Sequence, residues 1–151
     1  MRLLIFYIVI FFSIFDPASS TAETLAVKSQ NLNLRSGPGE NYSVKCVYSK
    51  GFPLKVVGKK GDWVRVTDFE NEDGWASRQL LATTPHAIIS ANRGQKKKVN
   101  IRSGPDNKFN IVGQAYYGVI FTVLEKKGRW RKIRHGSGLT GWIQQDFLWG
   151  I

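Results

Sequence analysis

Two hexapeptides decide the fold of this chain: Asn33-Leu34-Arg35-Ser36-Gly37-Pro38 and Asn100-Ile101-Arg102-Ser103-Gly104-Pro105. The second lies 67 positions after the first (102 − 35). Residues 32–81 align with residues 99–148 without a gap, with 14 identities in 50 positions. The identical residues are mostly Gly, Pro, Trp and Arg, which have special backbone or contact requirements. The chain therefore contains two copies of one domain.

Each copy consists of short extended runs separated by turn residues. Apolar residues alternate with polar ones in both copies, as in Leu54, Val56, Val64 and Val66 and in Phe121, Val123 and Ile133. A period of two is typical of half-buried strands, and short strands with frequent turns favour a small antiparallel barrel. We also expect a strand at residues 24–28 and at residues 86–90. The sequence predicts an all-β protein of two tandem barrels.

The N-terminal residues predict export. Residues 3–15 read LLIFYIVIFFSIF, and small residues follow at 18–22. A helix of that length covers roughly 20 Å, less than the ~30 Å of a bilayer core, so a signal peptide over residues 1–22 is predicted. Cleavage is expected before Glu23 or before Thr21, and an uncleaved anchor is the alternative. The expected domains are residues 23–83 and 84–151, the linker is residues 82–85, and contact between the copies is expected because the linker is short.

The charge is large and uneven. The net charge is +11, and the second copy contains the dense basic runs, at residues 93–102 and 126–134, whereas residues 68–73 of the first copy form an acidic loop. Basic surfaces attract anionic polymers and membrane surfaces. For an exported protein we expect peptidoglycan or another anionic envelope component as partner and no nucleic acid. The acidic loop is read as solvated, and we expect it to meet a basic patch of the second copy.

The single cysteine, Cys46, excludes an intramolecular disulfide, so packing must stabilise the domains. Cys46 aligns with Gly113, which favours a small buried position; a reactive thiol or an intermolecular disulfide is the alternative.

The motifs of both copies resemble the bacterial Src-homology-3-like (SH3-like) domain. In the first copy they are residues 32–39, Lys50-Gly51, Gly61-Asp62-Trp63 and Gly74-Trp75-Ala76, and the second copy repeats them in order. The resemblance implies a five- or six-stranded, partly open barrel. It also implies binding to cell-wall peptide or glycan, or tethering of a catalytic domain to the wall.

Aromatic and basic residues are candidates for ligand binding in both copies. Each has a structural alternative: the arginines can bind backbone carbonyls, the tryptophans can seal a barrel wall or lie between the barrels, and the rings after the Gly-Pro turns can plug a barrel end. Arg131 replaces Val64 and interrupts the alternation of its strand. The candidates are Arg35, Tyr42, Trp63, Arg65, Arg102, Phe109, Trp130, Lys132 and Arg134.

No catalytic constellation is predicted. His86 and His135 are distant in sequence and lack matching partners, and no metal-ligand or nucleophile motif occurs, so no cofactor or metal is expected. The sequence predicts a non-catalytic exported module, periplasmic or secreted, that binds peptidoglycan. The alternative is a protein–protein adaptor of the cell envelope.

Overall fold

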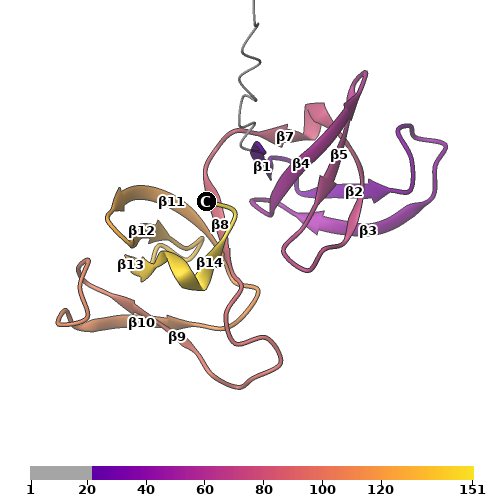
Figure 1. Ribbon diagram of the computed structural model, residues 1–151. Coiled ribbons are helices and arrows are strands. Elements are labelled where there is room, and N and C mark those ends of the chain that lie inside the picture. Colours follow the sequence, from indigo (N-terminus) through magenta and orange to yellow (C-terminus); the bar gives the residue numbers. More distant parts are fainter. Residues whose placement is uncertain (1–21) are drawn as a thin grey trace, which may run out of the picture.

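The computed structural model describes residues 22–151, and the predicted signal peptide therefore lies outside the described residues except for Ala22. Figure 1 shows two β structures joined by the chain that enters β8. Within residues 22–151 the chain forms strands and two single-turn 3₁₀ helices but no α-helix. In this part of the chain no helix has the length and apolar character needed to span a membrane. The predicted all-β fold is confirmed for the described residues.

The first domain is one antiparallel sheet with the strand order β3-β2-β6-β5-β4-β1-β7. Its elements are β1 (Thr24–Val27), β2 (Asn31–Arg35), β3 (Val44–Ser49), β4 (Pro53–Lys60), β5 (Trp63–Thr67), β6 (Asp73–Ser77), η1 (Arg78–Leu80) and β7 (Leu81–Ala82).

The second domain repeats this topology with the order β10-β9-β13-β12-β11-β8-β14. Its elements are β8 (His86–Ile89), β9 (Val99–Arg102), β10 (Ile111–Ala115), β11 (Ile120–Lys127), β12 (Trp130–Arg134), β13 (Thr140–Gln144), η2 (Gln145–Phe147) and β14 (Leu148–Trp149). The strands expected near residues 24–28 and 86–90 are β1 and β8. Each sheet has seven strands rather than the five or six that the resemblance implied, since the two-residue β7 and β14 pair with β1 and β8.

The alternating apolar residues form a separate core in each domain. Leu32, Leu34, Val64 and Val66 are buried in the first, and Ile101, Ile133 and Ile143 in the second. Gly74 is required where β6 crosses β2, because a Cβ there would lie 2.8 Å from the Arg35 carbonyl oxygen, and Gly141 has the same 2.8 Å approach to the Arg102 carbonyl. The repeated Gly-Trp pairs therefore reflect close strand packing.

Two residues depart from the simple alternation. Arg131 lies on the buried face of β12, where its guanidinium donates to the carbonyls of Gly128 and Trp130 and to Gln145 Oε1. Cys46 is half-buried against the first core rather than fully buried. A Cβ at the equivalent Gly113 would lie 2.7 Å from a Leu139 methyl group, so the Leu139 side chain would have to shift to admit it.

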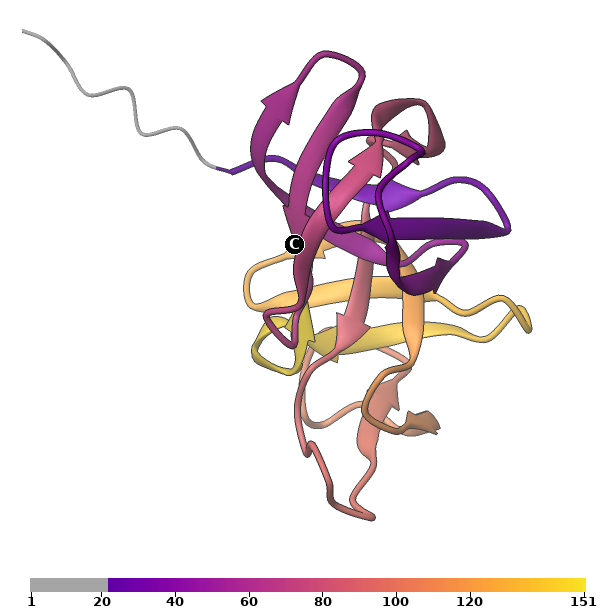
Figure 2. The same cartoon turned by 90° about the vertical axis from the view of Figure 1, so that its right-hand side faces the viewer.

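The two domains touch, as the short linker predicts. Figure 2 shows them stacked on one another. Glu70 of the acidic loop accepts a hydrogen bond of 2.5 Å from the Tyr117 hydroxyl and lies 3.3 Å from the Arg93 guanidinium. Phe69 packs between Tyr117, at 5.2 Å, and Trp149, at 6.5 Å between ring centroids. The expected meeting of the acidic loop with a basic patch is confirmed.

Candidate functional site

Each domain has a groove of about 310 Å³ in the same place. The first groove is lined by Arg35 of β2, Trp63 of β5, Glu40 and residues of β6 and η1. The second groove is lined by Arg102 of β9, Trp130 of β12, Asn107, Lys97 and Lys98. These residues match across the 67-residue offset, including Glu40 with Asn107. No residue of the other domain lines either groove, so the tryptophans are not buried between the barrels.

The two groove arginines support the loop that follows their strand. Arg35 donates to the carbonyls of Glu40 (2.9 Å) and Tyr42 (2.8 Å), and Arg102 donates to the carbonyl of Phe109 (2.9 Å). Carbonyl binding of this kind is the structural alternative stated above. Because a guanidinium has five N–H donors, the remaining ones are free for a ligand at the groove wall.

The groove tryptophans lie opposite the core. Val64 and Val66 are buried on β5, and Trp63 and Arg65 face the other side, as the alternation predicts. Both Trp63 and Trp130 are half-buried, so part of each ring faces solvent within its groove. A partly exposed indole offers a flat surface for stacking on a sugar ring or a peptide.

The grooves differ in charge. The first contains one arginine and one glutamate, Arg35 and Glu40, whereas the second contains three cations, Lys97, Lys98 and Arg102, and no acidic residue among those that line it. Amide side chains complete the second groove, with Gln144 donating to Asn107 Oδ1 at 3.2 Å. The sequence analysis did not select these amides as candidates. Asn100 and Asn107 align with Asn33 and Glu40 of the first groove, so the 67-residue offset was the signal that could have located them.

The other predicted residues lie outside the grooves. Arg65 pairs with Asp73 at 2.5 Å, and Lys132 stands 5.9 Å from the ring centroid of Trp142. Tyr42 and Phe109 lie over the Gly-Pro turns: a Cβ on Gly37 would come within 2.3 Å of the Tyr42 ring, and one on Gly104 within 2.6 Å of the Phe109 ring. Arg134 lines a different pocket. Of the candidate residues, the structure thus brings Arg35 and Trp63 together, and Arg102 and Trp130.

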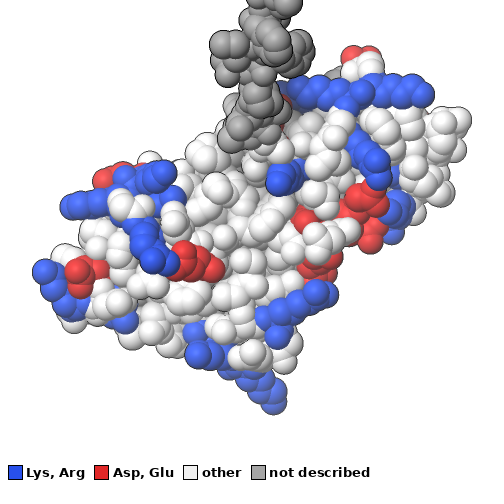
Figure 3. All heavy atoms as spheres, in the orientation of Figure 1, with Lys and Arg blue, Asp and Glu red and all other residues white. Residues whose placement is uncertain are grey.

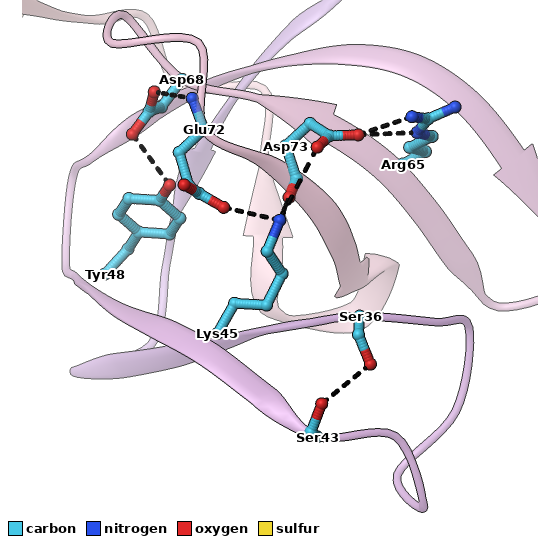
Figure 4. Close-up of polar contacts among 8 residues, drawn as sticks. All are labelled: Ser36, Ser43, Lys45, Tyr48, Arg65, Asp68, Glu72 and Asp73. Atoms are coloured by element: carbon cyan, nitrogen blue, oxygen red, sulfur yellow. Dashed lines mark hydrogen bonds and ion pairs between the residues drawn. The ribbon is translucent and has the colours of Figure 1, made fainter.

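Hydrogen bonds hold the acidic loop in place, and its first residue is buried. The interpretation from sequence, that the loop is solvated, is therefore corrected. Asp68 is buried, accepts from the Tyr48 hydroxyl (2.9 Å) and accepts from the N–H groups of Glu70 (2.8 Å) and Glu72 (2.9 Å) (Figure 4). Burial, followed by contacts with Cys46 and Asp68, raises the pKa of Tyr48. The hydrogen bonds that the buried Asp68 accepts therefore hold the loop in place.

Two of the exposed acids of this loop, Glu72 and Asp73, are paired within the first domain. Lys45 lies 2.6 Å from Glu72 and donates to the Asp73 carbonyl (Figure 4). The hydrogen bond from Arg65 holds the pKa of Asp73 below its usual value, and the bond to Glu72 raises the pKa of Lys45. Figure 3 shows acidic and basic side chains meeting at the boundary between the domains, where Glu70 faces Arg93. Glu70, Glu72 and Asp73 therefore each pair with a cation that does not line the second groove.

Comparison with known families agrees with this geometry. Two models, each described as a bacterial SH3 domain, match residues 28–82 and residues 97–148. The chain contains two bacterial SH3 domains. The matched segments include both grooves, and the repeated motifs described above are therefore those of this family.

Two curated proteins resemble the chain. YrvJ of Bacillus subtilis (strain 168), named as an N-acetylmuramoyl-L-alanine amidase, is 25% identical over 143 residues, which cover 91% of this chain and 27% of YrvJ. Serine/threonine-protein kinase D of Synechocystis sp. is 33% identical over 76 residues, covering 46% of this chain and 14% of the kinase. The chain thus spans about a quarter or less of the length of these relatives.

Solved structures align with the chain only at low sequence identity. NlpC1 from Trichomonas vaginalis aligns at 16% identity with a TM-score of 0.37, covering 88% of this chain and 47% of NlpC1. An NlpC/P60 family protein from Bacillus cereus ATCC 10987 aligns at 14% identity with a TM-score of 0.37, covering 83% of this chain and 55% of that protein.

Proposed function

We propose that this protein is a non-catalytic, exported binding module that attaches to cell-wall peptidoglycan, by its peptide or its glycan, through the second groove. The observation that carries this proposal is the composition of that groove: Trp130 lies beside Lys97, Lys98 and Arg102, with no acid among the lining residues. An indole can stack on a sugar ring, and cations pair with the carboxylates of a stem peptide. The amidase relative is named for N-acetylmuramoyl-L-alanine, a sugar–amino acid unit of the cell wall, which supports an envelope location.

The first groove serves as the natural control. It keeps Trp63 and Arg35 but places Glu40 where the second groove has Asn107. A carboxylate in that place repels an anionic ligand. We therefore expect the second SH3 domain to contribute most of the affinity, with the first adding avidity when both contact one polymer.

Co-sedimentation with purified insoluble peptidoglycan at low and high salt tests the proposal. The protein should pellet above a monomeric protein of similar charge, and Trp130→Ala should weaken binding about threefold to tenfold through lost stacking. Trp63→Ala is the matched control and should change binding less. Thermal unfolding of both variants checks that each still folds. Pelleting equal to that of the basic control protein, or equal losses in the two tryptophan variants, would contradict the proposal.

A second candidate function is an envelope protein–protein adaptor. It is favoured by the edge strands β3 and β10, which end their sheets and expose Val44, Val47, Ile111 and Val112. An exposed edge can accept a strand from a partner. Crosslinking in intact cells should then recover one dominant protein, whereas recovery of wall fragments alone favours peptidoglycan binding.

A further inference from the structure

A third cavity lies between the two domains and shares no lining residue with either groove. It measures about 470 Å³. The first domain contributes Lys50 and Gly51, from the turn between β3 and β4. The second contributes His86, Arg134 and His135, above a floor that includes Ile120 and Phe121. We call this cavity the interdomain pocket.

The strand register brings three of its side chains into one row. Thr122 of β11 pairs with His86 of β8 on one side and with Arg134 of β12 on the other. Residues directly opposite on neighbouring strands point to the same face of a sheet. The contact of 3.4 Å between Thr122 Oγ1 and His86 Nε2 agrees with this arrangement.

The hydrogen bonds of the imidazoles leave one nitrogen of each ring available. His86 Nδ1 lies 3.0 Å from the Thr84 carbonyl oxygen, which can only accept, so Nδ1 carries the proton and Nε2 remains for Thr122 or a ligand. His135 Nδ1 accepts from the Ser137 N–H (3.2 Å) and lies 2.8 Å from Ser137 Oγ, so its proton is on Nε2.

All charged groups at the interdomain pocket are basic. Lys50 and Arg134 line it, and Lys28 lines an adjoining cavity that also contains His86 and Lys50. No aspartate or glutamate is among the residues that line either cavity. The turn glycine Gly51, at φ +83°, leaves room for the histidine: a Cβ there would meet the His86 ring at 3.0 Å.

The first domain lacks this set, so the fold does not require it. The corresponding row on β1, β4 and β5 is Thr24, Lys55 and Thr67. Domain architecture alone therefore does not explain why the second domain gathers two imidazoles and a guanidinium at the contact.

We propose that the interdomain pocket binds an oxyanion, a carboxylate or phosphate group, between Lys50, His86 and Arg134. Since Lys50 belongs to one domain and the other groups to the second, the bound anion also links the domains. This site is independent of the second groove and of peptidoglycan binding.

Titration with sulfate, followed by NMR of the imidazole Cε1–H signals, tests the proposal. Sulfate is a dianion near neutral pH and serves as the probe oxyanion. At constant pH and ionic strength, the His86 and His135 signals should shift saturably as sulfate is added. Arg134→Thr, which installs the residue of the first domain, should weaken binding about threefold to tenfold.

Lys126→Thr is the matched control, because it removes an exposed charge of β11 outside the interdomain pocket. Equal weakening by Lys126→Thr and Arg134→Thr would show a response to net charge and overturn the proposal, as would shifts that do not saturate. Glycerol 3-phosphate and N-acetylalanine then distinguish a phosphate ester from a peptide carboxylate. A failure here leaves the co-sedimentation result unaffected.

Discussion

The two grooves have the same frame and different chemistry. Each has a tryptophan from the fifth strand of its domain and an arginine that holds the loop after the second, but Glu40 in one corresponds to Asn107 in the other. The contact between the domains is also built from residues that the repeat does not share, since Phe69 aligns with Gly136 and Tyr117 with Lys50. The two copies therefore share their turns, their core and the frame of the groove. They differ in the charges of the groove and in the surfaces that form the domain contact.

The largest effect is expected when a cavity is made in the core of one domain and the unfolding of both domains is measured. Leu34 and Ile101 are equivalent and fully buried. Leu34→Ala and Ile101→Ala should each lower the free energy of unfolding by about 2–5 kcal/mol through lost burial and a cavity. Urea unfolding, followed by signals from both domains, measures this.

Because Phe69, Tyr117 and Trp149 connect the domains, each core variant should shift the unfolding of both. A shift confined to the mutated domain would show that the domains unfold independently. Lys126→Ala, at an exposed position, serves as the control and should change stability by less than about 0.5 kcal/mol.

A smaller loss of unfolding free energy is expected when Asp68 is replaced. Asp68 has no counterpart in the second domain, because His135 occupies the aligned position. Asp68→Ala removes the acceptor of the Tyr48 hydroxyl and of the Glu70 and Glu72 N–H groups. Leaving buried donors unpaired costs about 1–3 kcal/mol. Asp68→Asn, which retains one carbonyl acceptor, should recover part of the loss; equal stability of Asp68→Ala and the unchanged protein in thermal unfolding contradicts the prediction.

The sequence predicted the parts of this structure that depend on local pattern. Alternation and turn glycines predicted both sheets, and the 67-residue offset matched Arg35 with Arg102 and Trp63 with Trp130. That the arginine and the tryptophan of each domain line one groove was not predicted. Cross-strand neighbours were not predictable: the row of His86, Thr122 and Arg134 depends on a register that no local pattern encodes. For Arg131 the sequence indicated only an interruption of the apolar alternation in its strand, not its burial. Its partners, a backbone carbonyl of the preceding turn and the Gln145 side chain, lie outside that strand and are not encoded by a local pattern.

The next prediction concerns the aligned pair Glu40 and Asn107, where only the first groove has an acidic residue. Glu40→Asn should make the first groove resemble the second and strengthen peptidoglycan binding, and Asn107→Glu should weaken it, each by about twofold to fivefold, as expected for a partly exposed charge. Co-sedimentation at low salt measures both, and high salt should reduce the differences. An effect from Glu40→Asn alone would place the main site in the first domain, and opposite signs would contradict binding of an anionic ligand.

The smallest effect is expected from the pH dependence of the domain contact. Burial between the domains, and then the hydrogen bond to Glu70, raises the pKa of Tyr117 to about 12, above the ordinary tyrosine value of 10.0. The folded protein therefore holds this proton more tightly than the unfolded chain. The contribution of Tyr117 to stability is complete below about pH 10 and is lost as the pH rises through about 12.

Tyr117→Phe isolates this contribution, because Tyr48 also has a raised pKa and remains in the variant. The variant should lose about 0.5 kcal/mol at neutral pH, the lower end for one hydrogen bond, since Tyr117 is only half-buried. Its stability should then fall less steeply than that of the unchanged protein between about pH 10 and about pH 12. Parallel curves in urea unfolding across that range would show that the Tyr117–Glu70 bond does not join the domains in solution, and the contact would then depend on Phe69 and its aromatic neighbours alone.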